Sequence, residues 1–141
     1  MTRIAVTGGR NYGFIPPHTP NFVREGAQIV ADRERQRFTQ IMDATIPRLG
    51  ITELAAGRCR TGADELAERW AKANKIPFTG FPANWQRLGN SAGPERNGRM
   101  LREFRPEKVI AFQGGDGTLD CCRQAWALGI EIITIDWTFT P

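Results

Sequence analysis

Three glycine-rich segments of the sequence carry the residues best suited to hold a phosphate group. They are Gly8-Gly9-Arg10, Gly57 to Gly62, and Gly114 to Thr118. Each follows a short apolar run typical of a buried β-strand. Glycine lets a ligand approach backbone N–H groups closely, and the start of a helix presents unpaired N–H groups and the positive end of its dipole. The spacing therefore predicts anion-binding loops at three strand ends.

The third segment is the most specific of the three. It reads KVIAF-QGGDGT-LDCCRQAWALG, which predicts a strand, a glycine loop and a helix. Gly114, Gly115 and Gly117 exceed what a tight turn requires, although a turn alone is the simpler alternative. We expect Thr118 to be the N-cap of the helix, and its hydroxyl or the loop amides to hold a phosphate or ribose. Asp116 either hydrogen-bonds sugar hydroxyls or suits the turn.

Charged residues accompany the second segment. Arg58 and Arg60 stand on either side of Cys59 after a predicted strand. Arginine offers a fixed fork of donors that matches phosphate. We expect Arg58 to contact the ligand, whereas Arg60 is better interpreted as a solvated loop residue. Asp64 either belongs to the start of the following helix or accepts a ribose hydroxyl, and the sequence leaves both open.

A long segment supplies the remaining binding candidates. Pro82 to Pro94 is predicted to be a loop, and long ordered loops are often functional. Trp85 either stacks on a nucleobase or packs in the core. Arg96 and Asn97 lie in the first turn of a predicted helix, Glu95 to Phe104, where they could point into a cleft.

Residues for other chemistries are scarce. The single histidine, His18, lies among prolines, so we expect no Ser-His-Asp set and no metal site. The three cysteines form no CxxC pair, and reduced thiols are the expected state. At least one of the adjacent Cys121 and Cys122 is expected in the core, because both lie in a helical pattern. We expect no cofactor.

The elements that must position these residues alternate along the chain. Strands are predicted at Arg3–Thr7, Ile51–Ala56, Pro77–Phe81, Lys108–Phe112 and Ile130–Ile135. Helices are predicted at Arg33–Leu49, Asp64–Lys75, Glu95–Phe104 and Thr118–Leu128. This alternation indicates an α/β fold, a Rossmann-like three-layer sandwich with a mainly parallel sheet of about five strands. Because parallel strands end at one edge of a sheet, the three glycine segments should meet around one cleft.

Composition is that of an ordinary soluble domain. The chain has 141 residues, of which 40% are hydrophobic and 24% charged. The net charge of +4 suits an anionic ligand, but with no run of five like charges it gives little support to nucleic acid as a partner. We find no signal-peptide pattern and no apolar run long enough to span a membrane, so a cytoplasmic protein without a membrane partner is expected.

Four ordered motifs resemble a known group. VTGGRNY, GRCRTGADELAERWA, FPANWQRLGNSAGPERNGRML and VIAFQGGDGTLDCCRQAWALGI are similar to the SLOG superfamily of Rossmann-like domains, and most of all to its small YspA-like branch of phages and bacteria. The resemblance covers nearly the whole chain except about residues 13–32, which we interpret as an insertion after the first strand. It implies a single domain, 1–141, that binds a nucleotide or nucleotide-derived ligand at its glycine loops.

The resemblance also bears on catalysis. The superfamily includes the LOG phosphoribohydrolases, which release a base from a nucleoside monophosphate and carry the motif PGGxGTxxE. In this chain Gln113 replaces the proline, and Cys121 stands where the catalytic glutamate would be. Asp120 is one position early, and one helical residue rotates a side chain by about 100°. Asp116 and Asp120 are the remaining candidates for a catalytic carboxylate.

We therefore expect a nucleotide-binding protein, most simply a sensor, without appreciable turnover. The alternatives are a LOG-like nucleotide hydrolase and a DNA-binding module like the superfamily member DprA. The missing glutamate weakens the first alternative, and the modest charge weakens the second. We also expect a homodimer, because SLOG relatives often self-associate and apolar helix faces beyond the needs of a core must be covered.

Overall fold

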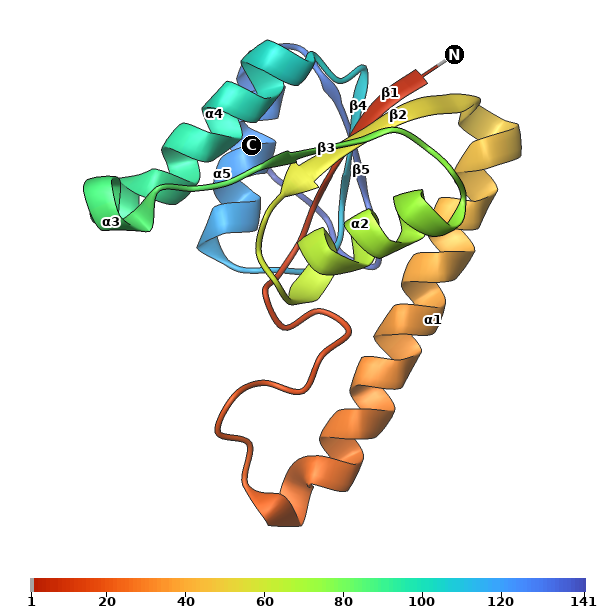
Figure 1. The fold of residues 1–141 in the computed structure, drawn as a ribbon, viewed down its shortest axis with the longest axis vertical. Helices are drawn as coiled ribbons and strands as arrows, with labels where there is room; N and C mark the ends of the chain where they lie inside the picture. Colours follow the sequence, from red (N-terminus) through yellow and green to blue (C-terminus); the bar gives the residue numbers. More distant parts are fainter. Residues whose placement is uncertain (1) are drawn as a thin grey trace.

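The computed structural model describes residues 2–141, which form a five-stranded parallel sheet flanked by helices (Figure 1). The strands are β1 (Thr2–Thr7), β2 (Ile51–Gly57), β3 (Phe78–Phe81), β4 (Lys108–Ala111) and β5 (Glu131–Thr134). The helices are α1 (Arg24–Leu49), α2 (Gly62–Ala73), α3 (Trp85–Leu88), α4 (Ala92–Phe104) and α5 (Asp116–Ala127), with short 3-10 turns at Asn21–Val23 and Gly89–Ser91. The predicted fold class, a Rossmann-like α/β sandwich, is confirmed.

The order of the strands in the sheet is β3-β2-β1-β4-β5. The chain therefore moves outward from β1 in one direction through β2 and β3, then returns to the other side of β1 for β4 and β5. In such sheets the loops after the two strands at the reversal leave toward opposite faces, and a crevice opens between them. Here those loops are the first and third glycine segments, which follow β1 and β4.

Two hydrophobic cores lie on opposite faces of the sheet. One contains side chains of α1 and α2, among them Phe38, Met42 and Trp70. The other contains side chains of α4 and α5, among them Met100 and Cys121. Both faces of the parallel strands are therefore covered, which explains why their sequences are continuous apolar runs and do not alternate.

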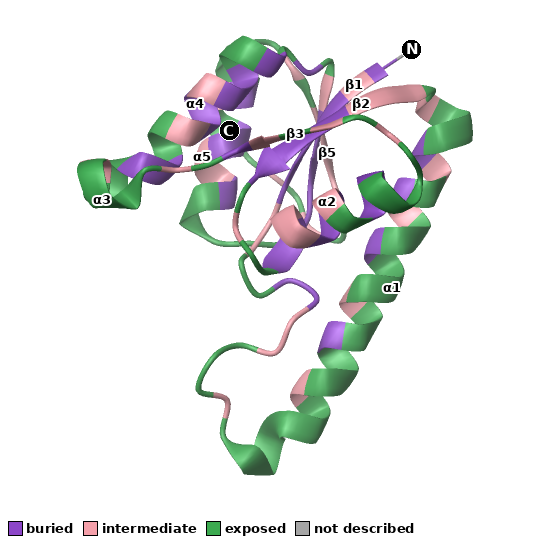
Figure 2. Cartoon of the chain, viewed as in Figure 1, coloured by how far each residue is buried: buried purple, intermediate pink, exposed green. Residues whose placement is uncertain are grey.

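Helix α1 begins earlier than the sequence predicts. The sequence predicts a helix that starts at Arg33, whereas α1 starts at Arg24. Its N-terminal half extends away from the sheet together with the loop that precedes it (Figure 1). That half is largely exposed (Figure 2), so the apolar periodicity of a packed helix is missing there. Phe22, just before α1, is an apolar residue that is 88% exposed. Exposed apolar surface was the reason to expect a homodimer, which stays a prediction.

Two other sequence expectations are wrong in detail. The segment from 82 to 94 is not a plain loop, because it contains α3, a 3-10 turn and the start of α4. Helix α5 begins at Asp116 with Gly115 as N-cap, so Thr118 lies inside the first turn and is not the cap. Both Cys121 and Cys122 are buried, as expected for at least one of them. No helix within residues 2–141 is long and apolar enough to cross a membrane.

Candidate functional site

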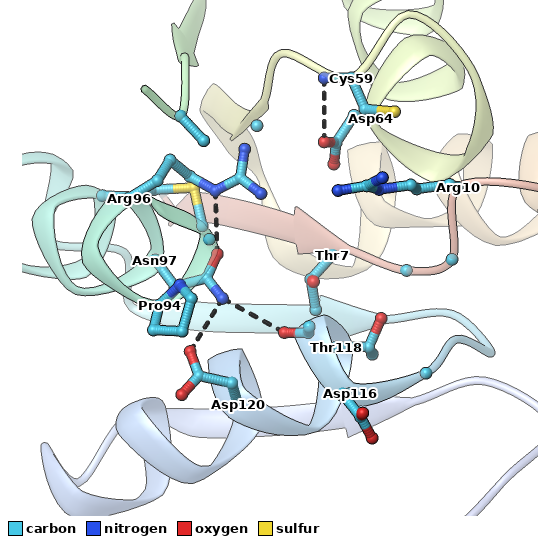
Figure 3. Close-up of a pocket in the computed structure, with 18 of the residues that line it drawn as sticks. Thr7, Arg10, Cys59, Asp64, Pro94, Arg96, Asn97, Asp116, Thr118 and Asp120 are labelled. Atoms are coloured by element: carbon cyan, nitrogen blue, oxygen red, sulfur yellow. Dashed lines mark hydrogen bonds between the residues drawn. The ribbon is translucent and has the colours of Figure 1, made fainter. Parts of the chain in front are cut away.

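A cleft of about 1060 Å³ lies beyond the carboxyl ends of β1 and β2 and beside the start of α5 (Figure 3). It brings together most of the residues that the sequence singled out. Those lining it are Gly8, Gly9, Arg10, Gly57, Arg58, Asp64, Trp85, Arg96, Asn97, Gly115, Asp116, Gly117, Thr118 and Asp120. Members of all three glycine segments thus face one space, as the positions of the strand ends predict.

Gly62 and Gly114 do not line this cleft, and their role is to let the loops pack together. Gly62 has a positive φ of 75°, and a β-carbon there would overlap the carbonyl oxygen of Gly9. A β-carbon on Gly114 would overlap the hydroxyl of Thr118 and approach the nitrogen of Gly9 to 2.7 Å. The loops are joined by hydrogen bonds as well: the Gly9 N–H donates to the Gln113 carbonyl at 2.9 Å.

Two helices begin at the cleft. Helix α5 starts at Asp116 after Gly115, which has no side chain to cap it. Helix α2 starts at Gly62, where the Thr61 side chain accepts no capping bond and the Ala63 N–H donates to the Gly9 carbonyl at 3.2 Å. The first N–H groups of a helix have no partner within the helix and carry a partial positive charge. A β-carbon at Gly115 or Gly117 would meet no atom within 4 Å, so open space lies above the start of α5. This surface suits an anion.

Asp64 supplies a carboxylate on the wall that α2 forms. Its Oδ2 atom accepts a hydrogen bond from the Cys59 N–H at 3.3 Å. Burial raises the pKa of Asp64, and the nearby positive charges of Arg96 and Arg10 oppose that increase. Arg10 extends toward Asp64 across the upper part of the cleft in Figure 3. The carboxylate is thus placed to accept hydrogen bonds from a ligand's hydroxyl groups.

A partly buried polar network ties α4 to α5 along the opposite wall. Asn97 donates from Nδ2 to Oδ2 of Asp120 at 3.0 Å and to the Gly117 carbonyl at 3.2 Å. Gln124 donates to the same Asp120 oxygen at 2.8 Å. Arg96 donates to Oδ1 of Asn97 at 3.0 Å, which fixes the orientation of the amide. These bonds hold the wall rigid, because each buried polar group has a partner.

Arg10 and Trp85 meet at the cleft. The guanidinium carbon of Arg10 lies 4.9 Å from the centroid of the Trp85 ring, in cation–π contact. Trp85 is 46% exposed, so of the two sequence interpretations packing in the core is excluded. Its edge approaches α4 at Gly93, where an added β-carbon would lie 3.3 Å from the ring. The indole is therefore supported on one side and available to a ligand.

Arg58 has a partner in the protein. Its guanidinium lies 3.8 Å from a carboxylate oxygen of Glu68, and its stem crosses Gly80 of β3 so closely that a β-carbon there would overlap it. The side chain is still 53% exposed and lines the cleft. An ion pair this exposed is weak, so an anionic ligand can compete for the guanidinium.

The residue that the resemblance sets at the position of the LOG glutamate is sealed from the cleft. This residue, Cys121, is fully buried in the core on the second face of the sheet, and burial raises its pKa to about 12. The one-residue rotation that separates Asp120 from Cys121 turns the cysteine inward and leaves the aspartate on the cleft wall. The carboxylate that reaches the cleft therefore belongs to Asp120, one position before the glutamate position of the motif.

Some lining residues were missed by sequence reasoning. Thr7 could have been found, because it is the last residue of β1. Arg123 could also have been found, because it lies one helical turn after Asp120. Asn90 lies in the segment 82–94, which the sequence marks as functional without pointing to this residue. The other missed positions are Val6, Cys59, Thr61, Pro82, Ala83, Gly93, Pro94 and Met100. Within residues 2–141, no three or more His, Cys, Asp or Glu side chains are grouped so that they could hold a metal ion.

The chain belongs to the YspA, cpYpsA-related SLOG family. The model of that family matches residues 2–88, more than half of the chain. The matched part runs from β1 through α3 and contains the first two glycine segments, Asp64 and Trp85. The family resemblance is thereby confirmed, although the fourth motif, residues 109–130, lies outside the matched part. No curated protein matches the chain.

Proposed function

We propose that the protein binds a nucleotide or nucleotide-derived ligand, one that contains a phosphoribosyl group, in the cleft at the ends of β1, β2 and β4. One observation carries this proposal: all three glycine segments face the same cleft, and helices α2 and α5 begin beside it. Membership of the SLOG family supports a nucleotide-related role. The cleft volume of about 1060 Å³ is large enough for a ligand of that size.

Each part of such a ligand has a chemically matched surface. The phosphate lies over the first turn of α5, at Gly115 to Thr118, where a β-carbon added at Gly115 or Gly117 would meet no atom within 4 Å and the first N–H groups of the helix have no partner within the helix. The ribose hydroxyls donate to Asp64. The base stacks on Trp85 and takes the place of the Arg10 guanidinium, which is then released to pair with the phosphate.

The ligand is bound without appreciable turnover. Cleaving an N-glycosidic bond passes through an oxocarbenium-like state that a positioned carboxylate would stabilise, or requires a carboxylate that activates water. Cys121 is buried and neutral, so it can do neither. Asp120 directs one oxygen, Oδ2, at two amide donors, which marks it as part of the network between α4 and α5.

The second candidate function is N-glycosidic hydrolysis of a nucleotide. It is favoured by one observation, that Asp120 lines the cleft with its carboxylate oriented by Asn97 and Gln124. Under this alternative the second oxygen, Oδ1, would act on the sugar or on water. The two functions predict different outcomes with the same substrates.

Two measurements test the proposal. Mass spectrometry of small molecules released on denaturing the purified protein should detect a phosphorylated nucleoside derivative. Chromatography after incubation with the common nucleoside monophosphates should detect no free base. Base release that disappears in Asp120→Asn but persists in Asp116→Asn would establish the hydrolase and reject the binder. Absence of any bound or binding nucleotide would reject both functions.

A further inference from the structure

A second cavity adjoins the cleft on the side of α1. Its volume is about 540 Å³, and it lies between the loop after β1 and the exposed half of α1. The loop contributes Arg10, Asn11, Tyr12, Phe14 and Pro16, and α1 contributes Ala27, Val30 and Glu34. The segment that the four motifs leave out, residues 13–32, therefore contributes Phe14, Pro16, Ala27 and Val30 to this cavity.

The two cavities meet at the glycine loops. Gly9, Arg10 and Gly115 line both of them. Gly115 has φ −104° and ψ −142°, and a β-carbon there would meet no protein atom within 4 Å. Crowding therefore does not require glycine at this position. Its missing side chain instead leaves the passage between the two cavities open, beside the first N–H groups of α5.

The second cavity is less polar than the first. Its side chains are mainly aromatic or aliphatic, and its one carboxylate, on Glu34, accepts a hydrogen bond from the Gly13 N–H at 3.0 Å. Tyr12 is buried beneath it, with its ring 5.2 Å from that of Phe112. Phe14 is held in place by the guanidinium of Arg35, 4.5 Å from its centroid. Such a surface fits a flat ring and offers little to a second phosphate.

We propose that the ligand is a two-part molecule: a nucleotide in the cleft whose phosphate chain crosses Gly115 and carries a second ring-bearing group into the cavity against α1. This inference rests on the proposed function. The simplest member of the class is a pair of nucleosides joined 5′ to 5′ through a pyrophosphate. Its anionic bridge would lie where N–H groups and Arg10 are concentrated, and its second ring would cover Tyr12 and Val30.

Calorimetric titration tests the inference with defined probes. For adenine, guanine, cytosine and uracil, we compare the nucleoside monophosphate, the nucleoside diphosphate and the symmetric dinucleoside pyrophosphate. For the preferred base, the dinucleoside compound should bind about tenfold more tightly than the diphosphate, the gain expected from burying one further ring. The diphosphate controls for the additional phosphate charge.

A matched pair of variants locates the second ring. Val30 lines the cavity and is 53% exposed, whereas its neighbour Ile29 is 48% exposed and does not line it. Val30→Arg should remove the additional affinity of the dinucleoside compound and leave the monophosphate unaffected. Ile29→Arg should change neither. The introduced positive charge would attract an anion, so a loss of affinity confined to the dinucleoside compound reflects the space that the arginine side chain occupies.

The outcomes separate the two levels of the argument. Monophosphates that bind while the dinucleoside compound binds no more tightly than the diphosphate overturn the two-part ligand and leave the proposed function intact. Equal losses for both ligands in Val30→Arg, or equal effects of Val30→Arg and Ile29→Arg, also overturn it. If none of the nucleotides binds, the proposed function fails and the inference fails with it.

Discussion

The guanidinium of Arg10 lies 4.9 Å from the centre of the Trp85 ring, and this contact joins two elements that are far apart in the sequence. Arg10 follows β1 and Trp85 begins α3, and both line the cleft. Each side chain would make a stronger contact with a nucleotide than with the other, because a base stacks on the indole ring and a phosphate pairs with the guanidinium group. Under the proposed function, a bound nucleotide would therefore replace this contact with a base on Trp85 and a phosphate at Arg10.

Replacing the indole tests this relationship. Trp85→Leu should weaken binding of a nucleoside monophosphate by about 1–3 kcal/mol, the usual contribution of one stacked base. The free energy of unfolding should change little, because the side chain is half exposed. Trp126→Leu is the matched control, since Trp126 is also exposed but lies outside the cleft. Equal affinities of the Trp85 and Trp126 variants, measured by calorimetry, would show that the base binds elsewhere.

Arg58 and Arg60 offer a second comparison. Arg58 lines the cleft and Arg60 does not. Arg58→Ala should weaken binding of a phosphorylated ligand by about 1.5–3 kcal/mol through the loss of a charge-assisted hydrogen bond. Arg60→Ala removes the same charge from the same loop and should have a much smaller effect. Unchanged affinity of Arg58→Ala would mean that its ion pair with Glu68 is its only role.

Two glycines should respond oppositely to alanine substitution. Gly62 has a positive φ and lies against the backbone of Gly9 and Arg10, so Gly62→Ala should lower the free energy of unfolding by about 2–4 kcal/mol. Gly117 is helical with open space around it, so Gly117→Ala should keep or raise stability while its methyl group weakens nucleotide binding. Urea denaturation and calorimetry measure the two effects. Destabilisation by Gly117→Ala would contradict the open surface described here.

Asp64 should make stability depend on pH. Burial raises its pKa in the folded protein above the ordinary value of 3.8, so the folded state retains the proton to higher pH than the unfolded state does. The free energy of unfolding contributed by Asp64 is therefore highest below pH 3.8 and falls as pH rises through the raised pKa. Asp64→Asn should lack this decrease. Urea denaturation of both proteins across this range measures the difference, and a difference that grows with pH in favour of the wild type would refute the assignment.

The strands, and the placement of the glycine segments after them, could be predicted from the sequence. A short continuous apolar run followed by glycine has few interpretations other than a buried strand and a turn. The first half of α1 could not be predicted, since a helix that extends beyond the core has no apolar periodicity to reveal it. Helix α3 was missed because it is a single turn, capped by the side chain of Asn84, which accepts from the Arg87 N–H at 3.1 Å. It is shorter than any pattern that periodicity can detect.

The binding candidates were predictable where they follow strand ends, since strand polarity alone places those positions together. The hydrogen-bond network of Asn97, Asp120 and Gln124 could not be predicted, because Asn97 lies on a different helix from the other two residues. The inward direction of Cys121 also depended on packing. Its helix buries Thr118, Cys121, Cys122 and Ala125 against the sheet, and the sequence alone did not fix that face.

Amide NMR tests the central claim, that the phosphate of a nucleotide lies on the glycine loops, most directly. At 15.8 kDa the protein suits this measurement. Adding a nucleoside monophosphate should shift the N–H signals of residues 8–10 and 115–118 more than any others, and the matching nucleoside without phosphate should leave those signals nearly unchanged. Shifts confined to other parts of the chain, or equal shifts with the nucleoside and the nucleotide, would contradict the account.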